Sequence, residues 1–399
     1  MTRTTATPDN SGKKHTGRIE FIDLLRGWAV VVMIETHVFN ATLASDLLSG
    51  SAFQYLKFIN GLVAPSFLFA SGLAYAVTTR RKAQEYLSLG KPLMSQLGRI
   101  LTIALIGYLL HIPIFSARHL FTEATDEQWQ SFFQVDVLQC IAVSLLLLQA
   151  LLLALRSERR QYGAALLLSI LAVAATPFVW EINFWSQIPW IFAGYMNGIK
   201  YSLFPLFPWM AFLFAGAVAG YLFTEAREKA RSGAEPQAEK SALQSLVWTG
   251  GSLILAAFLL EHLFPAMRER PNYWSVSPAF FLLRLGIVMI LCSALAHWTL
   301  LVPSSGKPVI RLFGRESLLI YVAHLLLLFG SFGSFKLTRK VGGTFGYTEA
   351  SLLTLFFILL MFGSAFVWSN VKKTSPFWTR AATVSTIVVA AVSFLLGDG

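Results

Sequence analysis

The chain has 399 residues, of which 55% are apolar and only 13% are charged, about half the charged share of an average soluble domain. This composition excludes an ordinary soluble enzyme and predicts an all-α, polytopic transmembrane helical bundle. The net charge of +11 comes from small basic clusters between apolar runs, a pattern typical of membrane topology and anionic lipid contact rather than nucleic-acid binding. Cys140 and Cys292 lie in apolar runs, which excludes a disulfide framework and a cysteine-based zinc site.

Apolar runs of about 20 residues predict about eleven membrane spans, within a range of about 10–12. In chain order the expected spans are 21–42, 57–78, 99–116, 135–155, 161–181, 203–223, 244–264, 278–299, 309–332, 350–370 and 378–397. We expect them to form a single transmembrane domain at 21–397 behind a cytoplasmic tail at 1–20. The charged segment 224–243 predicts a flexible cytoplasmic linker between two groups of helices.

Loop charge sets the expected orientation. Lys and Arg concentrate in the amino-terminal tail and in every second loop after it, so the positive-inside rule places the amino terminus in the cytoplasm. The loop with Lys336, Arg339 and Lys340 breaks this rule, which indicates a re-entrant or interfacial piece, or a span count that is off by one. The first apolar run is too long and too charged for a signal peptide, so we expect a retained span in a bacterial inner membrane.

The first span, FIDLLRGWAVVVMIETHVFNATL, carries charge where a bilayer disfavours it. One charged side chain at the bilayer centre costs about 2.5–3.5 kcal/mol on insertion scales. Arg26 and His37 are separated by close to three helical turns, so they share one face, with His37 about 16 Å deeper along the axis. Asn40 lies on the same stripe, whereas Glu35 points to the opposite side.

Two interpretations of this span remain open. In the functional one, Arg26 binds a phosphate-bearing ligand at the cytoplasmic mouth and His37 is a base or nucleophile at depth. In the structural one, Arg26 reaches towards lipid headgroups and His37 is a hydrogen-bonded core residue. Glu35 needs a partner from another helix, for which Arg284 and Arg315 are candidates. The sequence has no His-Glu-x-x-His motif and no carboxylate-rich cluster, so we predict no metal site.

An Arg, ten intervening residues and a His in a first span resemble the membrane-bound acyltransferase superfamily, which includes the acyltransferase-3 family. Other segments resemble the heparan-alpha-glucosaminide N-acetyltransferase catalytic-domain family more closely. They are RIEFIDLLRGWAVVVMIETH, APSFLFASGLAYAV, VDVLQCIAVSLLLL, LFPLFPWMAFLFAGAVAGY and RLFGRESLLIYVAHLLLL, spread over most of the chain.

The resemblance implies an enzyme that moves an acyl group, expected to be acetyl, from cytoplasmic acyl-CoA to a sugar or other envelope acceptor through a hydroxyl or amine. The heparan enzyme places its active histidine between its first and second spans, where this chain, with NATLASDLLSGSAFQYLKFING, has none. His37, which matches the acyltransferase-3 motif, therefore remains the candidate for the catalytic histidine. A transporter or flippase for an envelope lipid or saccharide remains the alternative function.

The candidate site residues fall into three groups. The catalytic candidates are His37, Glu35 and His324, of which His324 either orients His37 or the acceptor, or is a core histidine bonded to a backbone carbonyl. The candidates for binding the phosphates of acetyl-CoA are Arg26, Arg80, Arg81, Arg99 and Arg315. The candidates for contacting the acceptor are Asn40, Asn60, Asp136 and Gln139.

Two further features of the sequence concern the outer loops and a proline in the second span. The outer loops at 117–134 and 182–202 are rich in aromatic residues, which indicates either an interfacial aromatic belt or a stacking surface for a sugar or headgroup. Pro65 is expected to kink the second span beside the cavity, because an interior proline removes a helix hydrogen bond.

Overall fold

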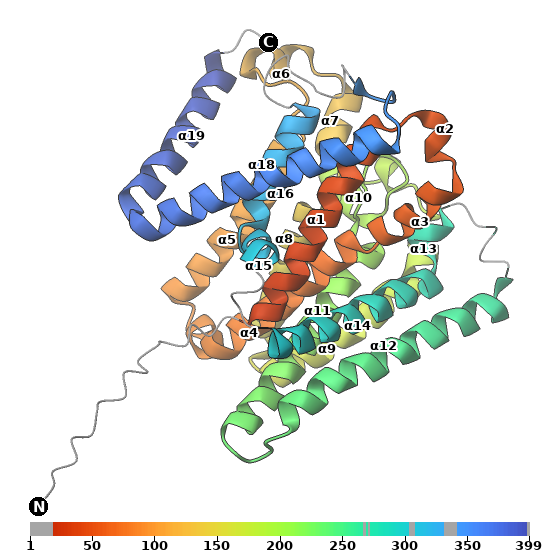
Figure 1. Cartoon of the computed structure of the whole chain (residues 1–399), viewed down its shortest axis with the longest axis vertical. Helices are drawn as coiled ribbons and strands as arrows, with labels where there is room; N and C mark the ends of the chain where they lie inside the picture. Colours follow the sequence, from red (N-terminus) through yellow and green to blue (C-terminus); the bar gives the residue numbers. More distant parts are fainter. Residues whose placement is uncertain (1–18, 266–268, 270–271, 303–307, 331–340, 397–399) are drawn as a thin grey trace, which may run out of the picture.

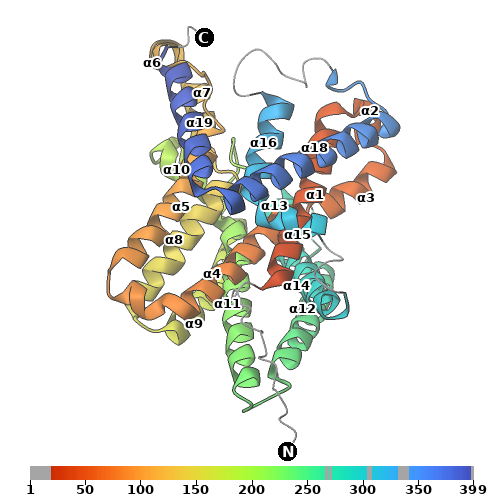
Figure 2. The same ribbon diagram turned by 60° about the vertical axis from the view of Figure 1, so that its left-hand side comes forward.

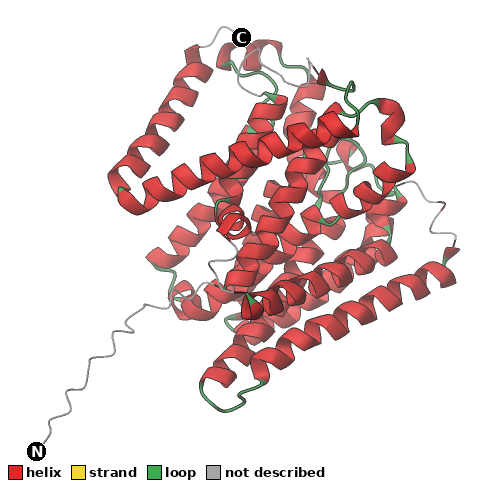
Figure 3. Ribbon diagram, viewed as in Figure 1, coloured by secondary structure: helices red, strands yellow, loops and turns green. Residues whose placement is uncertain are grey.

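The computed structural model describes residues 19–396 except 266–268, 270–271, 303–307 and 331–340. The described residues form an all-α bundle, so the predicted fold class is confirmed (Figures 1 and 3). Nine described helices are long and apolar enough to cross a membrane, and one bent helix pair brings the number to ten. The tail at 1–18 and the loop with Lys336, Arg339 and Lys340 lie outside the described residues.

The long helices are α1 (Glu20–Thr42), α4 (Val63–Leu87), α5 (Lys91–Leu109), α8 (Val137–Leu155), α9 (Glu158–Val179), α11 (Leu206–Arg231), α12 (Ala238–Leu263), α14 (Pro278–Leu301), α18 (Tyr347–Thr374) and α19 (Pro376–Leu396). The shorter helices are α2 (Ser45–Leu48), α3 (Ser51–Asn60), α6 (Ala117–Glu123), α7 (Asp126–Phe132), η1 (Phe184–Ser186), α10 (Trp190–Met196), α13 (Tyr273–Val276), α15 (Pro308–Arg315) and α16 (Ser317–Phe329). Every predicted span overlaps one or two of these helices.

Helix α1 is not among the nine helices that are long and apolar enough to cross a membrane, because it carries the charged residues Glu20, Asp23, Arg26 and Glu35. It is nevertheless largely buried, since α4, α14, α15, α16 and α18 pack around it. Burial inside the bundle removes these charges from lipid, and polar groups in such a helix are expected to face a cavity or a partner.

The span predicted at 309–332 is wrong as a single helix. The chain bends by 87° between α15 and α16. A side chain at Gly314 would collide with the backbone of Asp23, and one at Gly27 would collide with the backbone of Ile310. The short helix α15 therefore packs backbone to backbone on α1. The chain changes direction at Glu316, and α16 starts at the next residue.

The flexible linker predicted at 224–243 is also wrong for most of its length. Helix α11 continues to Arg231 and α12 begins at Ala238, so only 232–237 connect them. The segment is rich in Ala, Glu, Lys and Arg, which are strong helix formers. Ion pairs of Arg227 with Glu239 and of Lys229 with Glu235 tie the two helix ends together.

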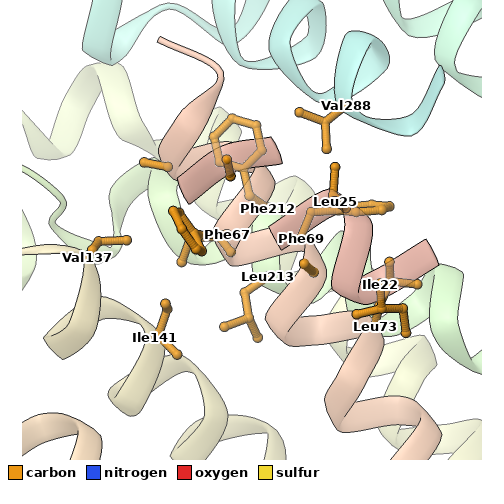
Figure 4. Packing of buried hydrophobic residues seen from close by; sticks show 14 of the residues in the cluster. Ile22, Leu25, Phe67, Phe69, Leu73, Val137, Ile141, Phe212, Leu213 and Val288 are labelled. Atoms are coloured by element: carbon orange, nitrogen blue, oxygen red, sulfur yellow. The ribbon is translucent and has the colours of Figure 1, made fainter. Parts of the chain in front are cut away.

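The core lies where α4 and α11 cross. Gly72 of α4 and Gly216 of α11 have no room for a side chain, because each faces the backbone of the other helix. Phe69 and Phe212 fill the space beside this crossing with Leu213 (Figure 4). Small residues at such crossings allow helices to pack closely inside a membrane.

Three pairs of consecutive long helices run in opposite directions, so the turns that join them lie on one side of the bundle. Short turns at 88–90, 156–157 and 232–237 join α4 to α5, α8 to α9 and α11 to α12. The first residues of α4, α8 and α11 therefore lie near the last turns of α1, and the short helices α6, α7 and α10 lie at the same side (Figures 1 and 2). The side with the three turns is the one expected in the cytoplasm.

Candidate active site

A cavity of about 160 Å³ lies where the end of α1 meets the beginnings of α4, α8, α11 and α14. This volume holds several water-sized molecules. Three predicted site residues line it: His37, Asn60 and Asp136. The other lining residues are Met33, Thr36, Gly61, Val63, Ala64, Phe67, Val137, Phe204, Trp209, Arg284 and Tyr321.

Local sequence explains why these side chains meet. Asn60 ends α3, and α4 starts at Val63, so the second span is broken beside the cavity. Pro65 falls in the first turn of α4, where its missing N–H removes no helix bond, and the break precedes it rather than following from it. Asp136 is the N-cap of α8 and accepts a hydrogen bond from the Val137 backbone N–H at 2.7 Å.

The two candidate histidines meet although they are 287 positions apart in the chain. Nδ1 of His37 lies 2.8 Å from Nε2 of His324. Their rings are nearly parallel, with an interplanar angle of 15° and centroids 5.1 Å apart. Nδ1 of His324 lies 2.7 Å from the carbonyl oxygen of Ile320. Both sequence interpretations of His324 therefore hold geometrically, since it bonds a backbone carbonyl and contacts His37.

These hydrogen bonds determine which ring nitrogens of His324 and His37 carry a hydrogen. A carbonyl oxygen only accepts, so Nδ1 of His324 carries the hydrogen that it donates to Ile320. His324 is fully buried, which favours the neutral ring, and its Nε2 then accepts from Nδ1 of His37. In neutral His37 the remaining nitrogen, Nε2, keeps its lone pair. Among the described residues, no hydrogen-bond partner engages Nε2, and His37 lines the cavity.

Asp136 is held from several sides. Its Oδ2 accepts a hydrogen bond from the Tyr321 hydroxyl at 3.1 Å and lies 3.7 Å from Nε2 of His111. Its Oδ1 accepts from the Val137 backbone. Asp136 therefore has a fixed orientation at the wall of the cavity, beside Tyr321 of α16.

Arg284 brings a guanidinium group to the same cavity. Its Cζ lies 3.8 Å from the centre of the Phe280 ring and 5.9 Å from that of Trp209. Contacts of this kind stabilise a cation on an aromatic face. The Arg284 Nη2 atom also lies against Gly61, 3.3 Å from where a Cβ would be.

Glu35 does not pair with Arg284 or Arg315. The Glu35 carboxylate interacts with the Asn60 side chain instead, and Arg315 is exposed. Glu35 itself does not line the cavity, but Asn60 does, so Glu35 lies behind a lining residue. Glu35 Oε1 and Asn60 Oδ1 are buried without a hydrogen-bond partner among the described residues.

Two predicted acceptor contacts are not among the lining residues. Gln139 is completely buried against Gly107 of α5, and both its polar side-chain atoms lack a partner within the described part of the chain. Asn40 is exposed. The helical stripe shared by Asn40 and His37 is therefore only partly turned to the cavity.

The predicted phosphate-binding arginines lie away from the cavity. Arg26 pairs with the buried Asp23 at 2.7 Å on α1. Arg80 pairs with Glu228 at 2.6 Å and with Glu158 at 3.6 Å. The remaining three, Arg81, Arg99 and Arg315, are exposed. None of the five lines the cavity that holds His37.

Sequence reasoning did not assign Trp209 or Tyr321 to the site and named Arg284 only as a partner for Glu35. Tyr321 lies one turn before His324, and Trp209 lies in the quoted motif LFPLFPWMAFLFAGAVAGY. Tyr321 therefore lies close to a candidate catalytic residue, and Trp209 lies within a segment that resembles the family. No group of three or more potential metal ligands occurs in the part of the chain that the structure describes.

Together, the apolar helices and the histidine pair at an internal cavity define an integral membrane protein with a buried polar site. A family model for the heparan-alpha-glucosaminide N-acetyltransferase catalytic domain matches residues 18–263. The chain therefore belongs to that family of membrane acetyltransferases. No curated protein matches it. The match includes His37, Asn60, Asp136 and Trp209, whereas Arg284, Tyr321 and His324 lie beyond its end.

Proposed function

We propose that this protein transfers an acetyl group from cytoplasmic acetyl-CoA to a hydroxyl or amine of a saccharide or other envelope acceptor. The observation that carries the proposal is the Ile320–His324–His37 chain of hydrogen bonds, which leaves the Nε2 lone pair of His37 at the cavity. Family membership supplies the class of reaction.

His37 is well arranged for the chemistry of acyl transfer. Its Nε2 accepts the proton of the acceptor hydroxyl or amine as that group attacks the thioester carbonyl, or attacks the carbonyl itself to form an acetyl-imidazole. His324 is a positioning residue, because it fixes the tautomer and the ring plane of His37. The surrounding apolar bundle limits wasteful hydrolysis of the thioester by water.

The donor is expected to enter from the basic side of the bundle. Arg81 and Arg99 are exposed there and can reach the phosphates of acetyl-CoA, while Arg26 pairs with Asp23 and Arg80 with Glu228. Arg315 remains a further candidate at the end of α15. The proposal places this basic side and the amino terminus in the cytoplasm, and the protein in a bacterial inner membrane.

The acceptor is expected to approach from the opposite side, where α3 and α4 are separated. Asn60 and Asp136 line the cavity there and offer an amide and a carboxylate to a polyhydroxylated or amino-bearing group. Glu35 supports Asn60 from behind. Asn40 and Gln139 remain candidates that require a rearrangement of side chains to reach the cavity.

The test is acetyl transfer by purified protein with labelled acetyl-CoA and an envelope saccharide extract. His37→Ala is expected to lower the rate by at least about 100-fold, the usual effect of losing a positioned base. His297→Ala is the control, because His297 is also a histidine on a spanning helix but lies outside the cavity, where it bonds the Ser293 carbonyl. Folding of each variant is checked by thermal denaturation.

Normal transfer by folded His37→Ala protein would contradict the assignment of His37. Saccharide uptake into vesicles without acetyl-CoA, and without acetylation, would instead support the transporter alternative. Acid-quenched protein incubated with labelled acetyl-CoA alone separates the two chemical routes, since only the acetyl-imidazole route leaves label on His37.

A further inference from the structure

The indole of Trp209 is a buried hydrogen-bond donor without an acceptor. Its residue is only 8% exposed, and Nε1 has no hydrogen-bond partner among the described residues. The indole N–H can only donate, and a buried donor left unpaired costs about 1–3 kcal/mol. Because Trp209 lines the cavity, the missing acceptor is expected to come from a molecule bound there.

The position of this ring is fixed by its neighbours. Trp209 follows Pro208 in the first turn of α11 and packs edge to face against Phe204, with ring centroids 4.8 Å apart. Arg284 lies over its face. By contrast, the nearby Trp180 indole donates to the carbonyl oxygen of Phe207 at 3.0 Å and so has a partner within the fold.

The surroundings of Trp209 favour negative charge on a bound group. The Arg284 guanidinium lines the same cavity. The carboxylate of Asp136 also lines the cavity, but it accepts from the Val137 backbone and the Tyr321 hydroxyl.

We propose that Trp209 Nε1 and the Arg284 guanidinium form the oxyanion hole for the transferred acetyl group. This inference rests on the proposed function, because it places the acetyl carbonyl in the cavity that holds His37. Preorganised donors of this kind stabilise charge that develops only in the transition state.

The chemical step balances as follows for direct transfer. The acceptor oxygen or nitrogen attacks the thioester carbon and gives its proton to His37 Nε2, while the carbonyl π electrons move to oxygen. That oxyanion accepts hydrogen bonds from Trp209 and Arg284. When the carbonyl reforms, the carbon–sulfur bond breaks, and the sulfur leaves as a thiolate that takes the proton from His37. The products are the acetylated acceptor and free CoA.

The test compares Trp209→Phe, which keeps the ring and removes the N–H, with the control Trp180→Phe. Trp209→Phe is expected to lower kcat by about 100-fold or more with little change in KM, whereas Trp180→Phe is expected to keep the parent kcat. A spectroscopic arm uses carbonyl-labelled [1-13C]acetyl-CoA bound to inactive His37→Ala protein. Adding Trp209→Phe is expected to raise the infrared carbonyl stretching frequency, because a hydrogen bond to the oxygen is lost.

An unchanged kcat and an unchanged carbonyl frequency in the Trp209→Phe proteins would overturn the oxyanion hole. If His37→Ala were inactive in the same experiment, the proposed function would still stand. Wild-type protein that transfers no acetyl group from acetyl-CoA would overturn both proposals together.

Discussion

The Tyr321 hydroxyl donates a hydrogen bond to Asp136 Oδ2 over 3.1 Å and so joins α16 to the residue that caps α8. Tyr321 lies one turn before His324, and the two rings pack edge to face with centroids 6.0 Å apart. The position of His324, and through it that of His37, therefore depends on a carboxylate at the wall of the cavity.

Replacement of Tyr321 by Phe tests this dependence. Losing a hydrogen bond to a charged group is expected to lower the free energy of unfolding by about 1.5–3 kcal/mol. Loosening of α16 is expected to lower kcat by up to about 100-fold, because small displacements of a catalytic group are costly. Thermal denaturation and acetyl-transfer assays measure the two effects. Tyr347→Phe is the control, since Tyr347 bonds the Leu47 carbonyl outside the cavity and is expected to change stability alone.

A second prediction concerns the hydrogen-bond acceptor that His324 offers to His37. His324→Leu removes that acceptor and is expected to lower kcat by about 100-fold or more, as expected when a catalytic histidine loses the group that sets its tautomer. His324→Gln keeps an amide oxygen and is expected to recover part of the activity. Equal activity of the Leu and Gln variants would show that His324 only fills space.

The sequence singles out the first span for a physical reason. Charged and polar residues are costly in a spanning helix, so their presence on the first span indicated a function or a partner. The sequence leaves the pairing of His37 with His324 as one of two possibilities, because helical spacing describes neighbours on one helix and says nothing of a side chain 287 positions away.

The errors also have particular causes. The bend at Glu316 depends on backbone contact of Gly314 with Asp23, which a count of apolar residues cannot show. The prediction that Arg26 and His37 belong to one site assumes that the whole helix face they share points to the same surroundings. In the structure Arg26 pairs with Asp23 and His37 turns to α16, so different neighbours divide that face.

The crossing of α4 and α11 provides a third prediction. Gly216 faces the backbone of Phe69, and a larger side chain would force the helices apart. Gly216→Leu is therefore expected to destabilise the fold by at least about 1–3 kcal/mol and to separate Trp209 from the beginning of α4. Gly163→Leu is the control, because nothing lies within 4 Å of a Cβ at that position. Equal melting temperatures of the two variants would contradict the tight crossing.

The orientation in the membrane gives a fourth prediction. Cys140 and Cys292 are buried, so a new surface cysteine is expected to be the main reactive thiol. Ser232→Cys, in the turn between α11 and α12, is expected to react with an impermeant maleimide only after the membrane is opened. Glu127→Cys, exposed on α7, is expected to react in intact cells. The reverse pattern would place the amino terminus outside.

The last prediction concerns the ion pair that anchors the beginning of α16. Lys372 of α18 donates to both oxygens of the buried Glu316 carboxylate, at 2.7 and 2.6 Å. Lys372→Met leaves that buried carboxylate without its charged donor and is expected to cost about 1–3 kcal/mol in stability, because a buried acceptor loses its partner.

The double variant Glu316→Gln with Lys372→Met removes both charges and is expected to recover most of the lost stability. Because α16 carries His324, acetyl transfer is expected to follow stability in this series, low in the single variant and restored in the double one. Thermal denaturation and transfer rates of the single and double variants complete the cycle. Additive losses in the double variant would show that the two residues act independently and that α16 is anchored elsewhere.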